Sequence, residues 1–335
     1  MAAAILTQCT RDIAPRVRET PFSGPIAWTR DSLAPEESVL RLEPECNREL
    51  AGALRTIRDN PLPVLMLEPS AFELTACRAL MIKAKRMLAA GSGFVLIDRL
   101  PLDDYTVDEA KAVYWVFAQL LARPVAQSWD GKMIYDVRDH GRPPGNGVRP
   151  DITNAEQSFH TDNSYNLCPP EYVALLCLHP AKEGGISRVV SFATAHNEML
   201  ARHARLLPRL YRPFFFDRQR EHAPGDPMVL EHPLFEYDGE RLTGRLSRFQ
   251  VRNGHKLAER ALDEEGDAAL EALDQVMKRP QLNCEFFFER GQIQIIDNRR
   301  LGHCRTGFSD FPEPERKRHL VRLWLRDAER RFYNG

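Results

Sequence analysis

The first third of the chain carries the apolar spacing of α-helices. Apolar residues recur every three to four positions through three stretches: 35–59, 70–91 and 106–123. In the second stretch, Ser70 is placed to cap the N-terminus of a helix and Gly91 to end it. In the third stretch, Thr106 and Glu109 have the spacing of a capping box. We therefore expect helices here, after an irregular segment, residues 1–35, that wraps over the domain surface.

Short extended runs dominate the chain after residue 125. These runs are 132–137, 171–178, 187–192, 235–247, 284–297 and 318–327. An earlier apolar run, residues 93–100, predicts a buried strand, and residues 289–291 predict a hairpin turn between two strands. Two helical inserts are expected near residues 193–210 and 258–278. Helices first and strands later predict an α+β fold with a β-sandwich or barrel core.

The bulk composition is that of a globular protein with a sizeable core. Of the 335 residues, 43% are hydrophobic and 28% are charged. The formal net charge of -1 provides no field that would attract nucleic acid or anionic lipid. The N-terminus lacks the basic start and long apolar core of a secretion signal, and no apolar run is long enough to span a bilayer. We therefore expect a cytoplasmic protein without nucleic-acid or membrane partners.

The cysteines and the missing motifs exclude several classes of function. The seven cysteines are scattered and form no Cys-x-x-Cys pair, which argues against a disulfide framework or a zinc-thiolate site and for a reducing compartment. The chain has no phosphate-binding glycine loop, no Gly-x-Gly-x-x-Gly after a strand, no Gly-x-Ser-x-Gly and no His-Glu-x-x-His. The sequence therefore lacks the usual motifs of nucleotide hydrolases, dinucleotide-dependent oxidoreductases, esterases and zincins.

The stretch FHTDNSYN, residues 159–166, is the best candidate for chemistry. His160 and Asp162 are two positions apart, and on an extended segment such residues point to the same face. The alternative is that His160 packs or caps and that Asp162 starts a turn. A third ligand would decide between them, and His303, expected in a loop after the strand that ends at Asp297, is the best candidate. Two imidazoles and one carboxylate would form the facial triad of an Fe(II)-class ion.

The last extended run supplies a candidate anion site. Val321, Leu323 and Leu325 alternate along it, so one face is apolar and must pack on other structure. Arg318 and Arg322 lie on the opposite face, roughly 13 Å apart along a strand. On a face in solvent they would be ordinary surface residues, but in a barrel interior each would need an anion to offset its desolvation. A five-carbon dicarboxylate chelated to a metal at one end would place its far carboxylate near such an arginine.

Taken together, these motifs resemble the taurine dioxygenase/clavaminate synthase-like family of Fe(II)/2-oxoglutarate oxygenases. The resemblance rests on an ordered set: the ligand pair, a Gly-Gly-x-Ser strand, the distal histidine and an Arg-x-x-x-Arg strand. It implies a double-stranded β-helix (jelly-roll) core with flanking helices, within a single domain, residues 1–335. Residues 1–90 would form an irregular and helical flank, and residues 91–330 the catalytic jelly-roll with its inserts.

The resemblance also implies roles for single residues. His160, Asp162 and His303 would bind iron. Arg318 would pair with the distal carboxylate of 2-oxoglutarate, and Ser187 falls where many relatives have a hydroxyl on the same carboxylate. A second arginine, Arg322, would lie nearer the iron and steer the cosubstrate or a substrate anion.

Glu156 and Cys304 can each be interpreted either as a functional residue or as an ordinary structural or surface residue. Glu156 occupies a position that is similar to a substrate-binding one in relatives, and the alternative is a solvated loop acid. Glu156 and Arg322 together would bind the two charges of a small zwitterionic substrate. If Arg322 binds only the cosubstrate and Glu156 lies in solvent, the site has room for a larger, neutral molecule. Cys304 lies beside the distal histidine and is interpreted as a packing residue.

The expected function is that of an Fe(II)/2-oxoglutarate-dependent dioxygenase. It would use O2 to hydroxylate an unactivated carbon of a small molecule, such as an amino acid or a derivative in specialised metabolism, and would release succinate and CO2. Desaturation, epoxidation or cyclisation would use the same residues. A non-redox metal enzyme of cupin type could use the same His/Asp/His set without the arginine strand, and a metal-free jelly-roll binding module would need neither. Iron-dependent succinate formation separates these classes.

Overall fold

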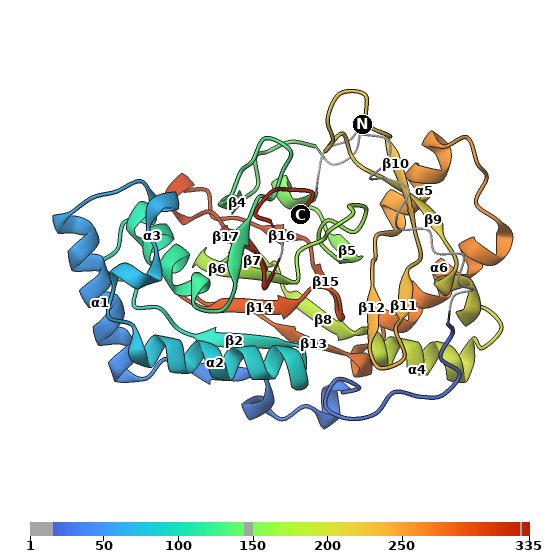
Figure 1. The fold of residues 1–335 in the computed structure, drawn as a ribbon, viewed down its shortest axis with the longest axis horizontal. Helices are drawn as coiled ribbons and strands as arrows, with labels where there is room; N and C mark the ends of the chain where they lie inside the picture. Colours follow the sequence, from blue (N-terminus) through green and yellow to red (C-terminus); the bar gives the residue numbers. More distant parts are fainter. Residues whose placement is uncertain (1–15, 144–149, 329) are drawn as a thin grey trace.

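Two β-sheets that share one hydrophobic core form the centre of the molecule (Figure 1). The computed structural model describes residues 16–143, 150–328 and 330–335. Within them, the larger sheet has the order β1 (Val39–Arg41), β2 (Phe94–Asp98), β14 (Ile293–Asp297), β6 (Tyr172–His179), β17 (His319–Arg326), β3 (Arg123–Val125), and β4 (Tyr135–Val137) also pairs with β17. The smaller sheet has the order β13 (Asn283–Phe286), β8 (Ser187–Ser191), β15 (Leu301–Arg305), β5 (Gln157–His160). The predicted α+β fold with a jelly-roll core is confirmed.

Short two-stranded ladders and 3-10 turns complete the structure. The ladders are β9 (Phe214–Asp217) with β10 (Val229–His232), β11 (Phe235–Tyr237) with β12 (Leu242–Gly244), and β7 (Glu183–Gly184) with β16 (Phe308–Ser309). The 3-10 turns are η1 (Arg30–Ser32), η2 (Pro35–Glu37), η3 (Val64–Met66), η4 (Pro69–Ala71), η5 (Pro150–Ile152), η6 (Leu207–Tyr211), η7 (Pro280–Leu282) and η8 (Pro314–Arg316). They connect the larger elements and leave the two main sheets as the frame of the molecule.

The N-terminal helices cover the outer face of the larger sheet. They are α1 (Pro44–Asp59), α2 (Thr75–Ala90) and α3 (Val107–Gln119), and they lie together at one end of the molecule (Figure 1). Their buried side chains share one cluster with Val321, Leu323 and Leu325, the predicted apolar face of β17. The capping box of α3 is also confirmed, because the Glu109 amide donates to the Thr106 hydroxyl at 3.2 Å and the Thr106 amide donates to the Glu109 carboxylate at 2.9 Å.

The predicted start of α2 at Ser70 is wrong. Ser70 lies in η4, and α2 begins five residues later at Thr75. The cap comes from another helix, because the Glu49 carboxylate of α1 accepts hydrogen bonds from the amides of Ala76 and Cys77 at 2.8 and 2.9 Å. Those amides belong to the first turn, which has no partner within its own helix. A cap supplied across 27 and 28 positions leaves no local signal in the sequence.

The predicted hairpin at residues 289–291 is also wrong. Strand β13 pairs with β8 in the smaller sheet, whereas β14 pairs with β2 and β6 in the larger one. The segment between them therefore carries the chain from one sheet to the other. Arg290 anchors this crossing by donating to the carbonyls of Leu178 and Leu102 at 2.6 and 3.0 Å. The glycine turn was recognised correctly, but the choice of strand partner depends on distant residues.

The insert helices lie at the opposite end of the molecule from α1 to α3 (Figure 1). They are α4 (Phe192–Arg202), α5 (Arg248–Leu257) and α6 (Glu264–Met277). The helix expected near residues 258–278 corresponds to α6, and α5 was not predicted. Helix α5 contains Gly254, which weakens its helical signal. That glycine is needed for packing, because a Cβ there would lie 2.3 Å from the Phe215 carbonyl oxygen of β9. None of the described helices combines the length and the apolar character that crossing a bilayer requires.

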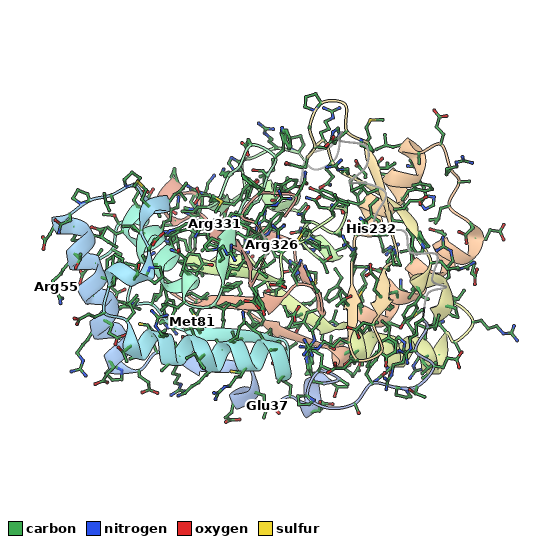
Figure 2. All side chains as sticks on the ribbon, in the orientation of Figure 1. Glu37, Arg55, Met81, His232, Arg326 and Arg331 are labelled. Atoms are coloured by element: carbon green, nitrogen blue, oxygen red, sulfur yellow. The ribbon has the colours of Figure 1, made fainter. Side chains whose placement is uncertain are left out.

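The C-terminal tail folds back against the end of β17. Arg326 is 1% exposed and lies near the centre of the molecule in Figure 2. Its guanidinium donates to the carbonyls of Cys168, Arg330, Phe332 and Tyr333. A buried cation that binds four carbonyls ties the tail to β17, the strand that carries Arg322 and directly follows Arg318.

Candidate active site

The two predicted histidine ligands lie directly opposite each other in the smaller sheet. His160 is the last residue of β5, and His303 is its partner in the middle of the antiparallel strand β15. Their ring centroids are 4.2 Å apart. The expectation that His303 lies in a loop is therefore wrong: the segment around it looks irregular because it holds Gly302 and charged residues, but pairing with β8 and β5 makes it a strand.

Asp162 follows β5 in a turn that distant residues hold in place. Its amide donates to the Asn298 side-chain oxygen at 2.8 Å, and the Asn298 amide group donates back to the Asp162 carbonyl at 3.0 Å. One residue earlier, Thr161 exchanges two hydrogen bonds with Leu246. Asn298 is 1% exposed and was not recognised from the sequence, because its partner lies 136 positions away.

The three side chains converge on one point. Oδ1 of Asp162 lies 3.3 Å from Nε2 of His160 and 3.5 Å from Nε2 of His303, and one ligand atom from each residue falls within 4.8 Å of the others. Nδ1 of His160 donates to the Ser158 carbonyl at 2.9 Å, which leaves a lone pair on Nε2. The Gln157 side-chain nitrogen lies 2.9 Å from Nε2, so a metal ion would take the place of that contact. Two imidazole nitrogens and one carboxylate oxygen are the donor set of the non-haem Fe(II) facial triad.

The ionisation of this cluster suits a cation. Burial alone would raise the pKa of Asp162, but the charge of Arg322 and the contacts with the two histidines hold that pKa well below its usual value. Burial lowers the pKa of His303 to about 4, and the neighbouring His160 acts in the same direction. At neutral pH the cluster therefore contains a carboxylate and a neutral His303, which are the forms that bind metal.

The second oxygen of Asp162 has partners of its own. Oδ2 accepts a hydrogen bond from the Trp324 indole at 2.7 Å and lies 3.1 Å from the Arg322 guanidinium. Arg322 also donates to Gln127 at 2.9 Å and forms an ion pair with Asp151 at 3.6 Å. The structure thus places Arg322 beside the cluster, as predicted, with its guanidinium engaged by protein groups.

A small cavity of about 50 Å³ lies on one side of the triad and contains Arg318. The arginine is 5% exposed, and no carboxylate of the described residues lies within ion-pair distance of its guanidinium. One guanidinium nitrogen is buried without a hydrogen-bond partner among the described residues. Burial, followed by the charge of Arg305, lowers the pKa of Arg318 to about 9. A buried cation without a counter-charge is the arrangement expected of a site that receives an anion.

Ser187 lines the same cavity, and its neighbour Gln294 was not recognised from the sequence. The Ser187 hydroxyl donates to the Gln294 side-chain oxygen at 3.3 Å, and the Gln294 nitrogen is buried without a partner among the described residues.

Cys304 also lines this cavity. Burial raises the pKa of its thiol to about 12, and among the described residues the group that could hold a metal ion consists of His160, Asp162 and His303 without Cys304.

A larger cavity of about 550 Å³ lies on the other side of the triad. His160, Asp162 and Arg322 line both cavities, so the candidate metal position lies where they meet. The larger cavity is bounded by the segment that holds Glu156, by Trp324 and by one side of α5. Glu156 borders the space next to the triad and its side chain is exposed, so the substrate-binding role and the solvated loop acid both stay predictions.

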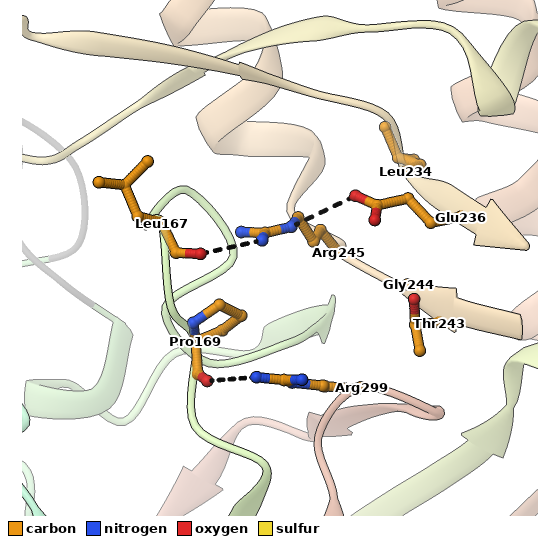
Figure 3. Close-up of a pocket in the computed structure, with 8 residues that line it drawn as sticks. All are labelled: Leu167, Pro169, Leu234, Glu236, Thr243, Gly244, Arg245 and Arg299. Carbon is orange, nitrogen blue, oxygen red and sulfur yellow. Dashed lines mark hydrogen bonds and ion pairs between the residues drawn. The ribbon is translucent and has the colours of Figure 1, made fainter. Parts of the chain in front are cut away.

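A third cavity, of about 160 Å³, lies away from the triad (Figure 3). Its two arginines hold the chain that follows Asp162: Arg245 donates to the carbonyls of Ser164, Asn166 and Leu167, and Arg299 donates to that of Pro169. Arg245 also lies 3.9 Å from Glu236 (Figure 3). These contacts support the ligand-bearing turn from outside, and none of the triad residues lines this cavity.

Comparison with known proteins agrees with this arrangement. The model of the taurine catabolism dioxygenase TauD/TfdA family matches residues 60–324. The chain is 28% identical over 316 residues to the FR-33289 synthase of Streptomyces rubellomurinus, covering 92% of this chain and 91% of that protein. It is 23% identical to the taurine hydroxylase-like protein SAT17 of Stachybotrys chartarum, covering 91% and 79% of the two chains.

Solved structures show the same fold. An asparagine oxygenase in complex with Fe(II), 2S,3S-3-hydroxyasparagine and succinate superposes with a TM-score of 0.64 at 18% identity, covering 86% of this chain and 93% of the other. The non-haem iron oxygenase OrfP in complex with Fe and alpha-ketoglutaric acid superposes with a TM-score of 0.61 at 16% identity, covering 87% and 94%. At these identities the likeness establishes the fold.

Proposed function

Because the chain belongs to the taurine catabolism dioxygenase TauD/TfdA family, we propose that it hydroxylates an unactivated carbon of a small molecule with Fe(II), 2-oxoglutarate and O2. One observation carries this proposal: the buried, unpaired Arg318 and the His/Asp/His triad face the same small cavity. A cupin-type metal enzyme or a metal-free binding module does not require an unpaired buried cation in the cavity that the metal ligands line. Such a charge destabilises the fold unless an anion binds to it.

In this proposal the residues of the small cavity hold the cosubstrate. His160, Asp162 and His303 hold the metal, which when bound couples the oxidation of the substrate to the conversion of 2-oxoglutarate into succinate and CO2. Arg318 binds the distal carboxylate of 2-oxoglutarate through its fork of N–H donors. Ser187 would donate its single hydroxyl proton to the same carboxylate, and to do so it would turn that proton away from the Gln294 oxygen. The apolar side chains of Leu175, Phe288 and Leu320 line the remainder and keep water from the cosubstrate.

The larger cavity is the proposed substrate site, and an amino acid or a close derivative is the proposed substrate. Glu156 would bind the amino group, and the volume of about 550 Å³ suits a small ligand. The product-bound structures of similar fold contain hydroxyasparagine and hydroxyarginine. Arg322 is already paired with Asp162 and Asp151, so in this proposal it serves the metal ligand first and a substrate anion second.

The proposed location is the cytoplasm. The described cysteines are all free thiols, as expected in a reducing compartment. An enzyme that uses Fe(II) also benefits from such an environment, because the ferrous state must be kept. Detection of the protein in a fractionated cell extract tests this expectation.

The reaction is tested by iron-dependent succinate formation. The purified protein would be loaded anaerobically with Fe(II) and 2-oxoglutarate, and then exposed to O2 with a panel of amino acids, their derivatives and taurine. Before O2 is added, we expect a metal-to-ligand charge-transfer absorption band. After O2 is added, we expect succinate formation that the substrate stimulates. Both should be absent in Asp162→Ala. A wild-type protein that shows neither the band nor succinate with Fe(II) would exclude the proposed function.

The amine-binding role of Glu156 has a separate test. Glu156→Gln removes the charge but keeps the size of the side chain. With the substrate found in the panel, we expect a KM raised by about 10- to 150-fold, from the loss of about 1.5–3 kcal/mol of a charge-assisted hydrogen bond. We also expect more succinate per hydroxylated product. Glu183→Gln, an exposed acid in β7 outside both cavities, is the matched control. Unchanged KM and unchanged coupling in Glu156→Gln would show that the amine lies elsewhere.

A further inference from the structure

The two carboxylate oxygens of Asp162 have different surroundings. Oδ1 faces the histidine nitrogens at 3.3 and 3.5 Å. Oδ2 points the other way and accepts the indole N–H of Trp324 at 2.7 Å, with a guanidinium nitrogen of Arg322 at 3.1 Å. Since an oxygen that is held by two donors cannot turn towards the histidines, only Oδ1 is presented to an ion between them.

The indole is itself held firmly. Trp324 is 3% exposed in β17, next to β6 and β3. The ring of Tyr333 is stacked on it, with centroids 6.4 Å apart and planes 18° apart. Tyr333 comes from the C-terminal tail and donates its hydroxyl to the Asn163 side chain at 3.1 Å. The residue that follows Asp162 is therefore tied to the aromatic ring that fixes Trp324.

Trp324 and Arg322 contribute differently to the same oxygen. Both project from the same face of β17, because they are two positions apart in a strand. Arg322 supplies charge, and it divides that charge between Asp162 and Asp151. Trp324 has one N–H donor and no net charge. It can therefore orient Oδ2 without repelling a positively charged metal ion, whereas the guanidinium of Arg322 would repel such an ion. A rigid, singly donating side chain is suited to setting direction.

We propose that Trp324, backed by Tyr333, is a positioning residue that makes Asp162 a ligand through one oxygen. This inference rests on the metal site of the proposed function. It assigns the C-terminal tail a part in the metal site, although the tail contributes no ligand. Outer-shell hydrogen bonds to ligating carboxylates change metal affinity by about 10- to 100-fold when they are removed.

The test is the metal affinity of Trp324→Phe, with Co(II) as the probe. Phenylalanine keeps an aromatic ring against Tyr333 and removes the N–H donor. We expect Co(II) to bind about 10- to 100-fold more weakly by calorimetric titration. We also expect a changed visible absorption of the Co(II) protein, because Oδ2 becomes free to turn towards the ion. Wild-type affinity together with a wild-type spectrum would overturn the proposal.

The matched control is Trp115→Phe. The indole of Trp115 is 1% exposed and donates to the Leu67 carbonyl at 3.0 Å, within the helical layer on the outer face of the larger sheet. Loss of this buried N–H should cost similar stability and leave Co(II) affinity and absorption unchanged. An equal weakening in both variants would mean that the effect of Trp324→Phe is one of general stability, and would overturn the proposal.

Two further variants keep the result decisive. Tyr333→Phe removes the hydroxyl that contacts the Asn163 side chain at 3.1 Å and the Tyr165 hydroxyl at 2.6 Å. It therefore tests the contact between the tail and the turn after Asp162 if Trp324→Phe does not fold. We expect a several-fold loss of Co(II) affinity with the circular dichroism of the wild type, and no loss would refute the role of the tail. Asp162→Ala separates the two levels of argument. If it binds Co(II) as the wild type does, the proposed metal site is wrong; if it does not and Trp324→Phe does, only the present inference fails.

Discussion

Replacing Arg318 with methionine should make the protein more stable and unable to use 2-oxoglutarate. The arginine is 5% exposed, and among the described residues no carboxylate balances it within ion-pair distance. Its pKa is lowered to about 9, first by burial and then by Arg305. Methionine has a similar length, fills the same space next to Phe308 and Leu320, and carries no charge.

The two effects have comparable sizes and opposite signs. Replacing buried ionic groups by apolar side chains of similar volume is often stabilising, by about 1–4 kcal/mol. The charge-assisted, bidentate bond to a carboxylate contributes about 1.5–3 kcal/mol, so its loss weakens 2-oxoglutarate binding by about 10- to 150-fold. In the proposed function, the cosubstrate would neutralise this cation, and that would explain why the protein retains a destabilising group.

The measurement is thermal unfolding of the Co(II)-loaded protein with and without 2-oxoglutarate. For the wild type we expect the midpoint to rise with ligand concentration, since a ligand that binds only the native state stabilises it by RT ln(1 + [L]/Kd). For Arg318→Met we expect a higher midpoint without ligand and almost no rise with it. Arg188→Met is the control, because Arg188 lies on neighbouring β8 and is paired with Glu285 at 2.6 Å. It should give no stability gain and keep the response to 2-oxoglutarate.

One outcome would refute this reasoning about the small cavity. An Arg318→Met protein whose midpoint still rises with 2-oxoglutarate as the wild type does would show that the distal carboxylate binds elsewhere. In that case the buried cation would have to be neutralised by another anion, and sulfate and succinate titrations of the same two proteins would identify its kind.

Two other variants test the support of the site and the buried histidines. Asn298→Ala should destabilise the protein by about 2–4 kcal/mol in urea unfolding and weaken Co(II) binding, because it leaves the buried amide of Asp162 without its acceptor; wild-type values for both would exclude Asn298 as the anchor of this turn. His196 is fully buried, and burial lowers its pKa to about 4, so the unfolded chain binds more protons than the native one between about pH 4 and pH 6.5, and stability falls as the pH drops through that range. His196→Gln should lose less of its thermal midpoint between pH 6.5 and pH 4.5 than the wild type does, and an equal loss would assign the acid sensitivity to other groups.

Local patterns in the sequence were sufficient for several of the elements and for proposing the candidate ligands. The capping box of α3 and the alternation along β17 were both read correctly, because a cap acts within three residues and a strand alternates at every second one. His160 and Asp162 were paired on the expectation of one extended segment, but the strand ends at His160 and Asp162 lies in the turn that follows. The order of the motifs along the chain then indicated the family, and with it the distal residues His303 and Arg318.

Only the tertiary structure decided which distant groups meet. The cap of α2 comes from Glu49 of another helix, and the strand expected to complete a hairpin joins the other sheet. The support of Asp162 is equally remote, from Asn298 through the backbone and from Trp324 through Oδ2. None of these contacts follows from periodicity, because periodicity reports which face of an element is buried and not which partner buries it. That choice depends on the packing of the whole chain, where burial and hydrogen bonding of all the elements are satisfied together.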